Sequence, residues 1–134
     1  QPLLATVRGE KASPEKAAAA LSAALHTQEA LLAPGDPELA VTLAALAELY
    51  ARQEATVNAE GLFNAAVDKL RAAAAAARRP SVLDALVKTL DAKSAFLAAA
   101  DERRAGEVRQ LEAEAARVGE ELDALLGRLG AGGA

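Results

Sequence analysis

The sequence contains no cysteine, and its single histidine is His26. Without cysteine the chain forms no disulfide, no thiolate nucleophile and no zinc–cysteine site. A transition-metal site needs several converging ligands, and one histidine does not supply them. His26 also falls outside the apolar stripe of its predicted helix, so we expect it at the surface. The sequence therefore predicts no metal-binding residue.

A basic excess and a long apolar run are also missing. The net charge is −4 and the sequence pI is about 5.1, which argues against binding of nucleic acid through its phosphates. No apolar run approaches the roughly 20 residues that a membrane-spanning helix needs. Methionine is absent and the chain starts at Gln1, so we expect a processed protein or a fragment. Organellar, cytoplasmic and ciliary locations all stay open.

The chain lacks the patterns of an enzyme as well. No glycine-rich phosphate loop follows a predicted strand, and no nucleophile elbow or serine–lysine arrangement is present. Neighbouring carboxylates, such as Glu120 with Glu121 and Glu112 with Glu114, lie beside arginines, a pattern typical of solvated helix faces. We expect a non-enzymatic protein with no catalytic residue, no cofactor and no small-molecule substrate.

Alanine and leucine are abundant. Alanine is the strongest helix former, and isoleucine, which favours strands, is absent. Ser13-Pro14-Glu15 and Asp36-Pro37-Glu38 both place a capping residue, a proline and an acid where a helix begins. Between such boundaries the apolar residues recur three and four positions apart. The sequence predicts an all-α protein with helices at about 14–33, 37–53, 58–78, 81–99 and 102–128.

Two features of this helical arrangement have alternative interpretations. The charged stretch 101–104 favours a break near 99–102, and the alternative is one long helix from 81 to 129. Gly61 lies inside a predicted helix, where it either allows a neighbouring backbone to approach closely or has no packing role.

The expected domain organisation is simple. We expect a single helical domain over 1–129, with 1–12 as a candidate remnant of a preceding helix. A disordered glycine and alanine tail is expected over 130–134.

The chain also repeats itself at a period of 42 or 43 residues. A shift of 43 residues places Pro37 on Pro80. Paired helices at such a period are typical of stacked hairpins, because one hairpin alone cannot cover its apolar face. A shift of 42 residues places four apolar positions on four others: Ala17, Leu21, Ala24 and Leu25 fall on Ala59, Phe63, Ala66 and Val67.

Residues 37–70 carry Leu43, Leu46, Ala47 and Tyr50 on one predicted helix and Ala59, Phe63 and Ala66 on the next. In this order the segment resembles a tetratricopeptide repeat of the long, kinesin-light-chain type. The linker of that repeat is echoed at 33–37. The resemblance is fair over 14–32 and weak from 81 onward. It implies stacked helical hairpins that act as a scaffold for protein–protein interaction.

The sequence departs from this family at the hairpin turn and in the inner groove. Glu54 stands where a glycine is usual, so we expect a looser turn. Ala44 and Ala45 stand where asparagines often grip a peptide backbone. The resemblance therefore implies the architecture, and these departures weaken what it implies about peptide binding.

Candidate partner-binding residues form two groups. The resemblance implies that three charged residues face the inner groove: Glu48, Arg52 and Asp91. The last predicted helix has a heptad pattern, typical of packing against another helix of this chain or of a partner. Its residues are Leu111, Val118, Leu122 and Leu125.

Arg71, Arg78 and Arg79 lie near the end of the helix before Pro80. Favourable interaction with the negative end of the helix dipole is the preferred interpretation. The alternative is that these arginines bind an acidic partner.

Two functions follow from these observations. The first is a non-catalytic scaffold that binds protein partners within a larger assembly. The second is a structural accessory subunit, an alanine-rich bundle held permanently in a large organellar, ciliary or cytoskeletal complex. A permanent subunit is expected to leave an apolar face uncovered when it is alone, whereas a scaffold is not.

Overall fold

The computed structural model describes residues 14–33 and 36–133. These residues form five α-helices and a 3-10 turn, with no strand among them, which confirms the all-α prediction. The predicted helix remnant at 1–12 lies outside the described residues. The elements are α2 (Pro14–Leu31), α3 (Pro37–Arg52), α4 (Thr56–Ala76), α5 (Pro80–Ala100), η1 (Glu102–Arg104) and α6 (Ala105–Gly133).

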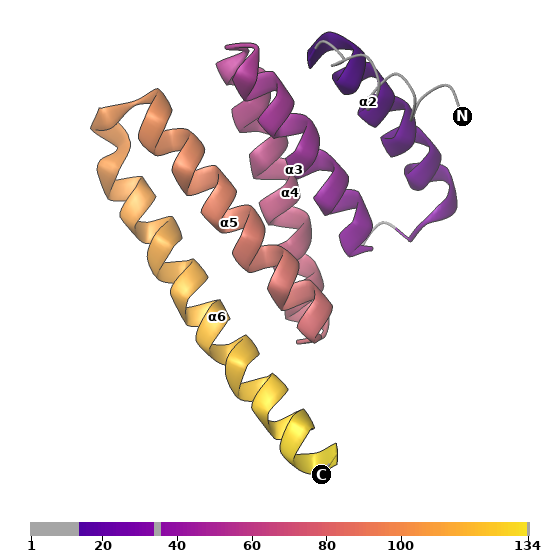
Figure 1. The fold of residues 1–134 in the computed structure, drawn as a ribbon, viewed down its shortest axis with the longest axis vertical. Helices are drawn as coiled ribbons and strands as arrows, with labels where there is room; N and C mark the ends of the chain where they lie inside the picture. The colour runs from indigo at the N-terminus through magenta and orange to yellow at the C-terminus, as the bar shows by residue number, and fades with distance from the viewer. Residues whose placement is uncertain (1–13, 34–35, 134) are drawn as a thin grey trace.

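The starts of α3 and α5 follow the proline signals. The side chain of Asp36 accepts a hydrogen bond from the backbone N–H of Glu38 at 2.9 Å, and Pro37 takes the first helical position. Pro80 takes the same position in α5. Proline suits this position because its φ is preset and its missing N–H would have no partner there. Both helices begin at the same end of the molecule (Figure 1).

The helices form stacked antiparallel hairpins (Figure 1). Each helix packs against the next in the chain, from α2 to α6. In addition, α3 contacts α5 directly, and the two run in the same direction with α4 behind them in this view. No such close backbone approach occurs between α4 and α6. Alternate helices therefore meet on one side of the stack only.

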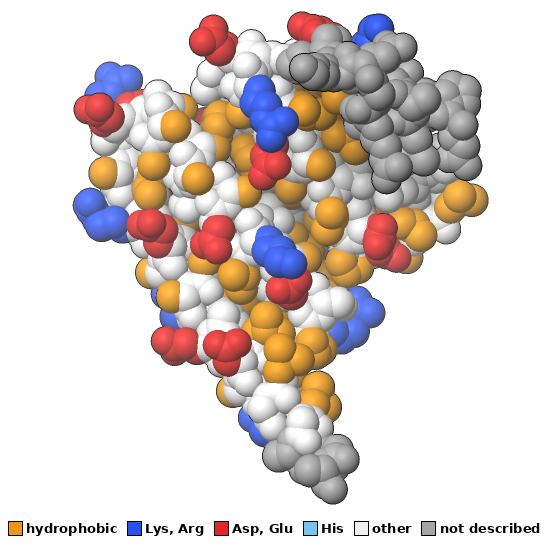
Figure 2. All heavy atoms as spheres, viewed as in Figure 1, with side chains coloured by type: hydrophobic (Ala, Val, Ile, Leu, Met, Phe, Trp, Pro, Cys, Tyr) orange, Lys and Arg blue, Asp and Glu red, His pale blue; other side chains and the backbone are white. Residues whose placement is uncertain are grey.

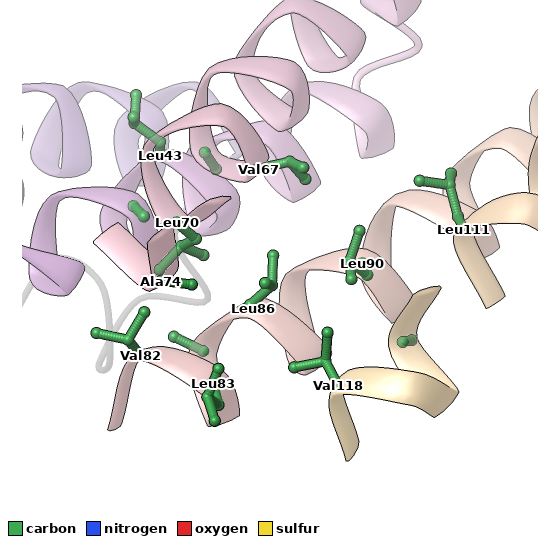
Figure 3. Packing of buried hydrophobic residues seen from close by; sticks show 14 of the residues in the cluster. Leu43, Val67, Leu70, Ala74, Val82, Leu83, Leu86, Leu90, Leu111 and Val118 are labelled. Carbon is green, nitrogen blue, oxygen red and sulfur yellow. The ribbon is translucent and has the colours of Figure 1, made fainter. Parts of the chain in front are cut away.

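The core is centred on α5. Leu83, Leu90 and Leu97 are wholly buried, and their spacing of seven residues puts them on one side of the helix. Figure 3 shows side chains of α5 between those of α4 and α6. The apolar side of α5 thus holds its two neighbours together. The buried residues that surround it are Val67, Leu70 and Ala74 from α4 and Leu111, Ala115 and Val118 from α6.

The predicted break between the last two helices is confirmed, and the alternative of one helix over 81–129 is wrong. Asp101 follows α5 with extended backbone, φ −155°, and its side chain accepts a hydrogen bond from the N–H of Arg103 at 3.0 Å. An aspartate that bonds the backbone two residues on favours a turn over a continued helix. As a result, α6 folds back along α5 (Figure 1).

The turn between α3 and α4 is tighter than the sequence predicts. The N–H of Ala55 bonds the carbonyl of Tyr50 at 2.9 Å, and the N–H of Glu54 bonds that of Ala51 at 3.1 Å. These two bonds form the Schellman motif that commonly closes a helix on glycine. Glu54 adopts the left-handed conformation, φ 62°, that glycine adopts more easily. The expectation of a looser turn is wrong because the backbone bonds hold Glu54 in the glycine conformation.

The structure also decides between the two interpretations of Gly61 and corrects the predicted end of the last helix. A Cβ added to Gly61 would meet nothing within 4 Å, so close approach of a backbone does not explain that glycine. In addition, α6 runs to Gly133 rather than ending near 128 before a disordered tail over 130–134. No proline interrupts its end, and glycine lowers helix stability by about 1 kcal/mol without preventing a helix.

Candidate functional site

Two adjoining cavities form a groove between α3 and α5. The N-terminal cavity, of about 670 Å³, lies beside the first halves of the two helices. The C-terminal cavity, of about 730 Å³, lies beside their second halves. Glu48 and Ala92 line both cavities, so the groove is continuous along the two helices. In Figure 2, hydrophobic side chains gather between charged ones on the face that α3 and α5 form.

Alanine is the commonest residue type along the groove, and charged residues line it as well. A methyl group reaches only a short distance from its helix, so the space between α3 and α5 stays unfilled although the two helices contact each other. The lining positions recur three and four residues apart and therefore share one side of each helix. The alanines are Ala44, Ala45 and Ala51 from α3 and Ala85, Ala92, Ala95, Ala99 and Ala100 from α5.

One aromatic pair borders the C-terminal cavity. The rings of Phe63 and Phe96 lie 5.3 Å apart between centroids, tilted by 40°. Phe63 is buried, whereas Phe96 is half-buried and offers part of its ring to the cavity. Phe96 therefore gives this end of the groove an aromatic surface that suits a large apolar side chain.

The edges of the groove are charged. Glu38 and Glu48 are exposed on α3 and form no ion pair among the described residues. On α5, Lys88 pairs with Asp84 at 3.0 Å. Thr89 lies between these edges, is only 4% exposed and makes no hydrogen bond within the described chain. The groove thus combines alanines, one unpaired hydroxyl and an α3 edge on which Glu38 and Glu48 outnumber Arg52.

Of the three charged residues predicted to face the groove, two line it. Glu48 lines both cavities and Arg52 lines the C-terminal one. Asp91 is exposed but lines neither cavity. It precedes Ala92, and one residue turns the helix by about 100°. The prediction for Asp91 is therefore wrong in its placement, while Ala44 and Ala45 line the groove at the positions noted in the sequence.

The heptad residues of α6 pack within the same chain. Leu111 and Val118 are buried against the core, and Leu122 and Leu125 are partly buried there. The helix that they pack against is α5. Of the two predicted options, the described chain shows the intramolecular one, and a role of these residues in partner binding stays a prediction.

A second space, the α4–α6 gap, is crossed by arginine–glutamate pairs. Arg71 of α4 donates to Glu114 of α6 over 3.0 and 2.6 Å, through Nε and Nη2. Arg104 of η1 donates to Glu60 of α4 over 2.6 and 2.7 Å. A third pair joins Arg78, which follows α4, to Glu121 of α6 through two bonds. Each pair is bidentate, the strongest geometry for such groups.

These bonds change the pKa values of the carboxyl groups. The guanidinium of Arg104 holds the pKa of Glu60 below its usual value of 4.5, and Arg71 and Arg78 act in the same way on Glu114 and Glu121. Hydrogen bonds to the ionised form favour that form. All three glutamates are therefore ionised near neutral pH, bound to arginines rather than presented to a partner.

Arg71 and Arg78 pair mainly with α6, which neither interpretation of the arginines near Pro80 anticipates. Arg78 also donates to the carbonyl of Ala74 in the last turn of α4 at 3.5 Å, as the preferred interpretation expects. Arg79 differs, because it lines the N-terminal cavity of the groove. The 43-residue spacing of both cross-gap pairs equals one repeat period, so each arginine and its glutamate are one period apart in the sequence.

Lys93 is a residue that sequence patterns did not single out. It is only 9% exposed and lines a cavity of about 520 Å³ in the α4–α6 gap. Its charge adds to that of the arginines in lowering the pKa of Glu60 and Glu114. The aliphatic part of the Lys93 side chain is buried, and its ammonium group contributes positive charge to the gap, as long lysine side chains allow.

Within 14–33 and 36–133, no group of three or more histidine, cysteine or acidic side chains is placed to hold a metal. As predicted, His26 is at the surface, its side chain 84% exposed and 4.0 Å from Glu29. None of the described helices is both long and apolar enough to cross a membrane. No protein-family model, no curated protein and no solved structure matches the chain.

Proposed function

We propose that this protein is a non-catalytic scaffold that binds a segment of a partner protein in the groove between α3 and α5. The observation that carries the proposal is the continuous groove itself, with cavities of about 670 and 730 Å³ and a floor of alanine. Apolar floors with polar edges are typical of surfaces where proteins bind one another.

The construction of the stack supports this role. The groove lies between two helices that both pack on α4, so its sides are held by the core rather than by loops. A groove on rigid elements loses little conformational freedom when a partner binds. The resemblance of 37–70 to a tetratricopeptide repeat favours the same function.

Affinity capture from the native source tests the proposal. The wild-type chain is compared with Ala92→Leu, which places a larger side chain where the two cavities meet, and with Ala75→Leu, the same change at an exposed position of α4 outside the groove. We expect partner proteins that Ala75→Leu retains and Ala92→Leu loses. Equal recovery with both variants would contradict a groove-binding scaffold.

A second function, permanent accessory subunit, is favoured by the free end of α6. This helix has 29 residues against 21 in α5 and extends about 12 Å beyond it at 1.5 Å per residue (Figure 1). Leu126 and Leu129 on this end are 49% and 57% exposed. Next to Leu122 and Leu125 they form an apolar surface that a neighbouring subunit could cover.

The behaviour of the isolated chain discriminates the two functions. For a scaffold, sedimentation velocity of the purified chain shows one monodisperse species. For a permanent subunit it shows self-association, which the double variant Leu126→Lys/Leu129→Lys relieves without change in the helical circular dichroism signal.

A further inference from the structure

We propose that the groove holds its partner segment as an amphipathic α-helix with a basic flank, an inference that rests on the groove being the binding site. The argument begins with the floor. An extended segment carries one N–H and one C=O per residue, and each needs a partner when buried. The methyl groups of Ala44, Ala45 and Ala92 supply neither donor nor acceptor. A helix bonds its own backbone groups except at its two ends, so a groove lined by alanine leaves few of them unpaired.

The single buried hydroxyl of the groove also favours a helical occupant over an extended one. Thr89 is 4% exposed, borders the N-terminal cavity and has no hydrogen-bond partner within the described chain. One hydroxyl can bond one polar side chain on a docked helix. It cannot serve the row of backbone groups that an extended segment would bury.

The dimensions fit a helix of about four turns. The 16 residues of α3 give the groove a length of about 24 Å, which matches about 16 residues of a helix laid along it. Small side chains on both sides let helix axes approach to about 8 Å. The C-terminal cavity, bordered by Phe96 and Ala95, is the place for the largest apolar side chain of the occupant.

Charge selects the flank of that helix. Glu38 and Glu48 are exposed on the α3 edge and have no ion-pair partner in the described chain. On the α5 edge, Lys88 already pairs with Asp84, and Arg79 adds an exposed cation. Arg52 is the single cation among the lining residues of α3 and lies at its C-terminal end. Lysine or arginine on the side of the occupant that faces α3 would therefore meet unpaired carboxylates. The occupant is thus a helix with one apolar face and a basic flank toward α3.

A display library of random 18-residue peptides is the probe for this inference. The library is selected on the full chain and counter-selected on Ala92→Leu. Ala95→Leu is a second groove variant, should Ala92→Leu fail to fold, and Ala75→Leu on the exposed side of α4 is the matched control. Binding of each selected peptide is measured by fluorescence anisotropy, before and after a proline replaces its central residue.

We expect selected peptides with apolar residues at helical spacing and lysine or arginine beside them. Their affinity should fall at least about tenfold on the groove variants and with the central proline, because proline breaks a helix, and stay unchanged on Ala75→Leu. Groove-dependent peptides that tolerate proline would overturn the helical inference and leave the scaffold function standing. Helical peptides with an acidic flank would overturn the charge assignment. A library without groove-dependent binders would overturn both proposals.

Discussion

The α3/α5 groove and the α4–α6 gap both lie between alternate helices of the stack, and they differ in the side chains that border them. In each, two alternate helices pack against the helix between them in sequence, α4 for the groove and α5 for the gap. Alanine lines the groove on both sides and leaves it open. Arginine and glutamate reach across the gap and bridge it, as in the pair between Arg71 and Glu114. Helix placement and side-chain length both differ between the two spaces, because α3 and α5 contact each other directly whereas α4 and α6 are joined by long side chains.

The difference assigns the two sides different roles. The bidentate bond between Arg71 and Glu114 holds α6 beside α4 over a distance that their backbones do not close. The groove has no equivalent bond between α3 and α5 in the described chain, and its exposed acids have no partner. The charged side holds the stack together, and the alanine side is the one that we propose binds another molecule.

The largest effect on stability is expected in α5, which lines the groove and packs against both helices of the gap. Leu90 of α5 is wholly buried, and Leu90→Ala should lower the free energy of unfolding by about 2–5 kcal/mol through lost burial and a cavity. Urea unfolding followed by circular dichroism measures this. Leu126→Ala, at a half-exposed position, is the control and should change it by less than about 0.5 kcal/mol. Equal effects of the two substitutions would show that α5 is not the centre of the core.

Acid should weaken the charged side selectively. The pKa values of Glu60, Glu114 and Glu121 are lowered by their arginines, so the ionised pairs stabilise the fold above pH 4.5. That stability is lost as the pH falls through the lowered pKa values. Hydrogen exchange at pH 7 and pH 3, corrected for intrinsic rates, should show the greater loss of protection in α6. The double variant Glu114→Gln/Glu121→Gln should flatten this dependence, and uniform loss along the chain would contradict it.

The turn between α3 and α4 can be stabilised at Glu54, which also lines the end of the C-terminal cavity. Glu54 holds φ 62°, a strained conformation for any residue with a Cβ. Glu54→Gly should raise the free energy of unfolding by about 1 kcal/mol, since glycine adopts this conformation without strain. Thermal unfolding measures the gain, and Glu54→Ala separates it from loss of charge. A gain with alanine equal to that with glycine would point to charge instead.

A single cross-gap pair should have a smaller effect. Arg71→Glu removes an ion pair worth about 0.2–1 kcal/mol and places the new carboxylate opposite that of Glu114. The swap Arg71→Glu/Glu114→Arg should restore part of the loss in a double-mutant cycle, and 1 M salt should reduce the coupling. Zero coupling between the two positions would mean that the pair does not hold α6.

The smallest effect on stability belongs to the groove. Ala95 is exposed and lines the C-terminal cavity, so Ala95→Leu should change the free energy of unfolding by less than about 0.5 kcal/mol. Differential scanning fluorimetry checks this. A loss above about 1 kcal/mol would show that α3 and α5 are closer than an open groove allows.

Much of the fold was predictable because its signals are local. Asp36 with Pro37, and Pro80, mark helix starts through chemistry that acts within one turn. The break at Asp101 was predictable for the same reason. The placement of Glu48 and Arg52 in the groove followed from the repeat, whereas Asp91 was misplaced because one residue of helical rotation carries it out of the groove.

The remaining features depend on distant parts of the chain. That Glu54 adopts a glycine conformation is decided by the backbone bonds of a turn closed between packed helices. Arg71 meets Glu114, 43 residues away, only once α4 and α6 lie on the same side of α5. By itself the sequence determined where helices begin and end, through propensity and capping that act locally. The tertiary structure alone decided which gap is bridged and which is open, because that depends on which side chains face one another across it.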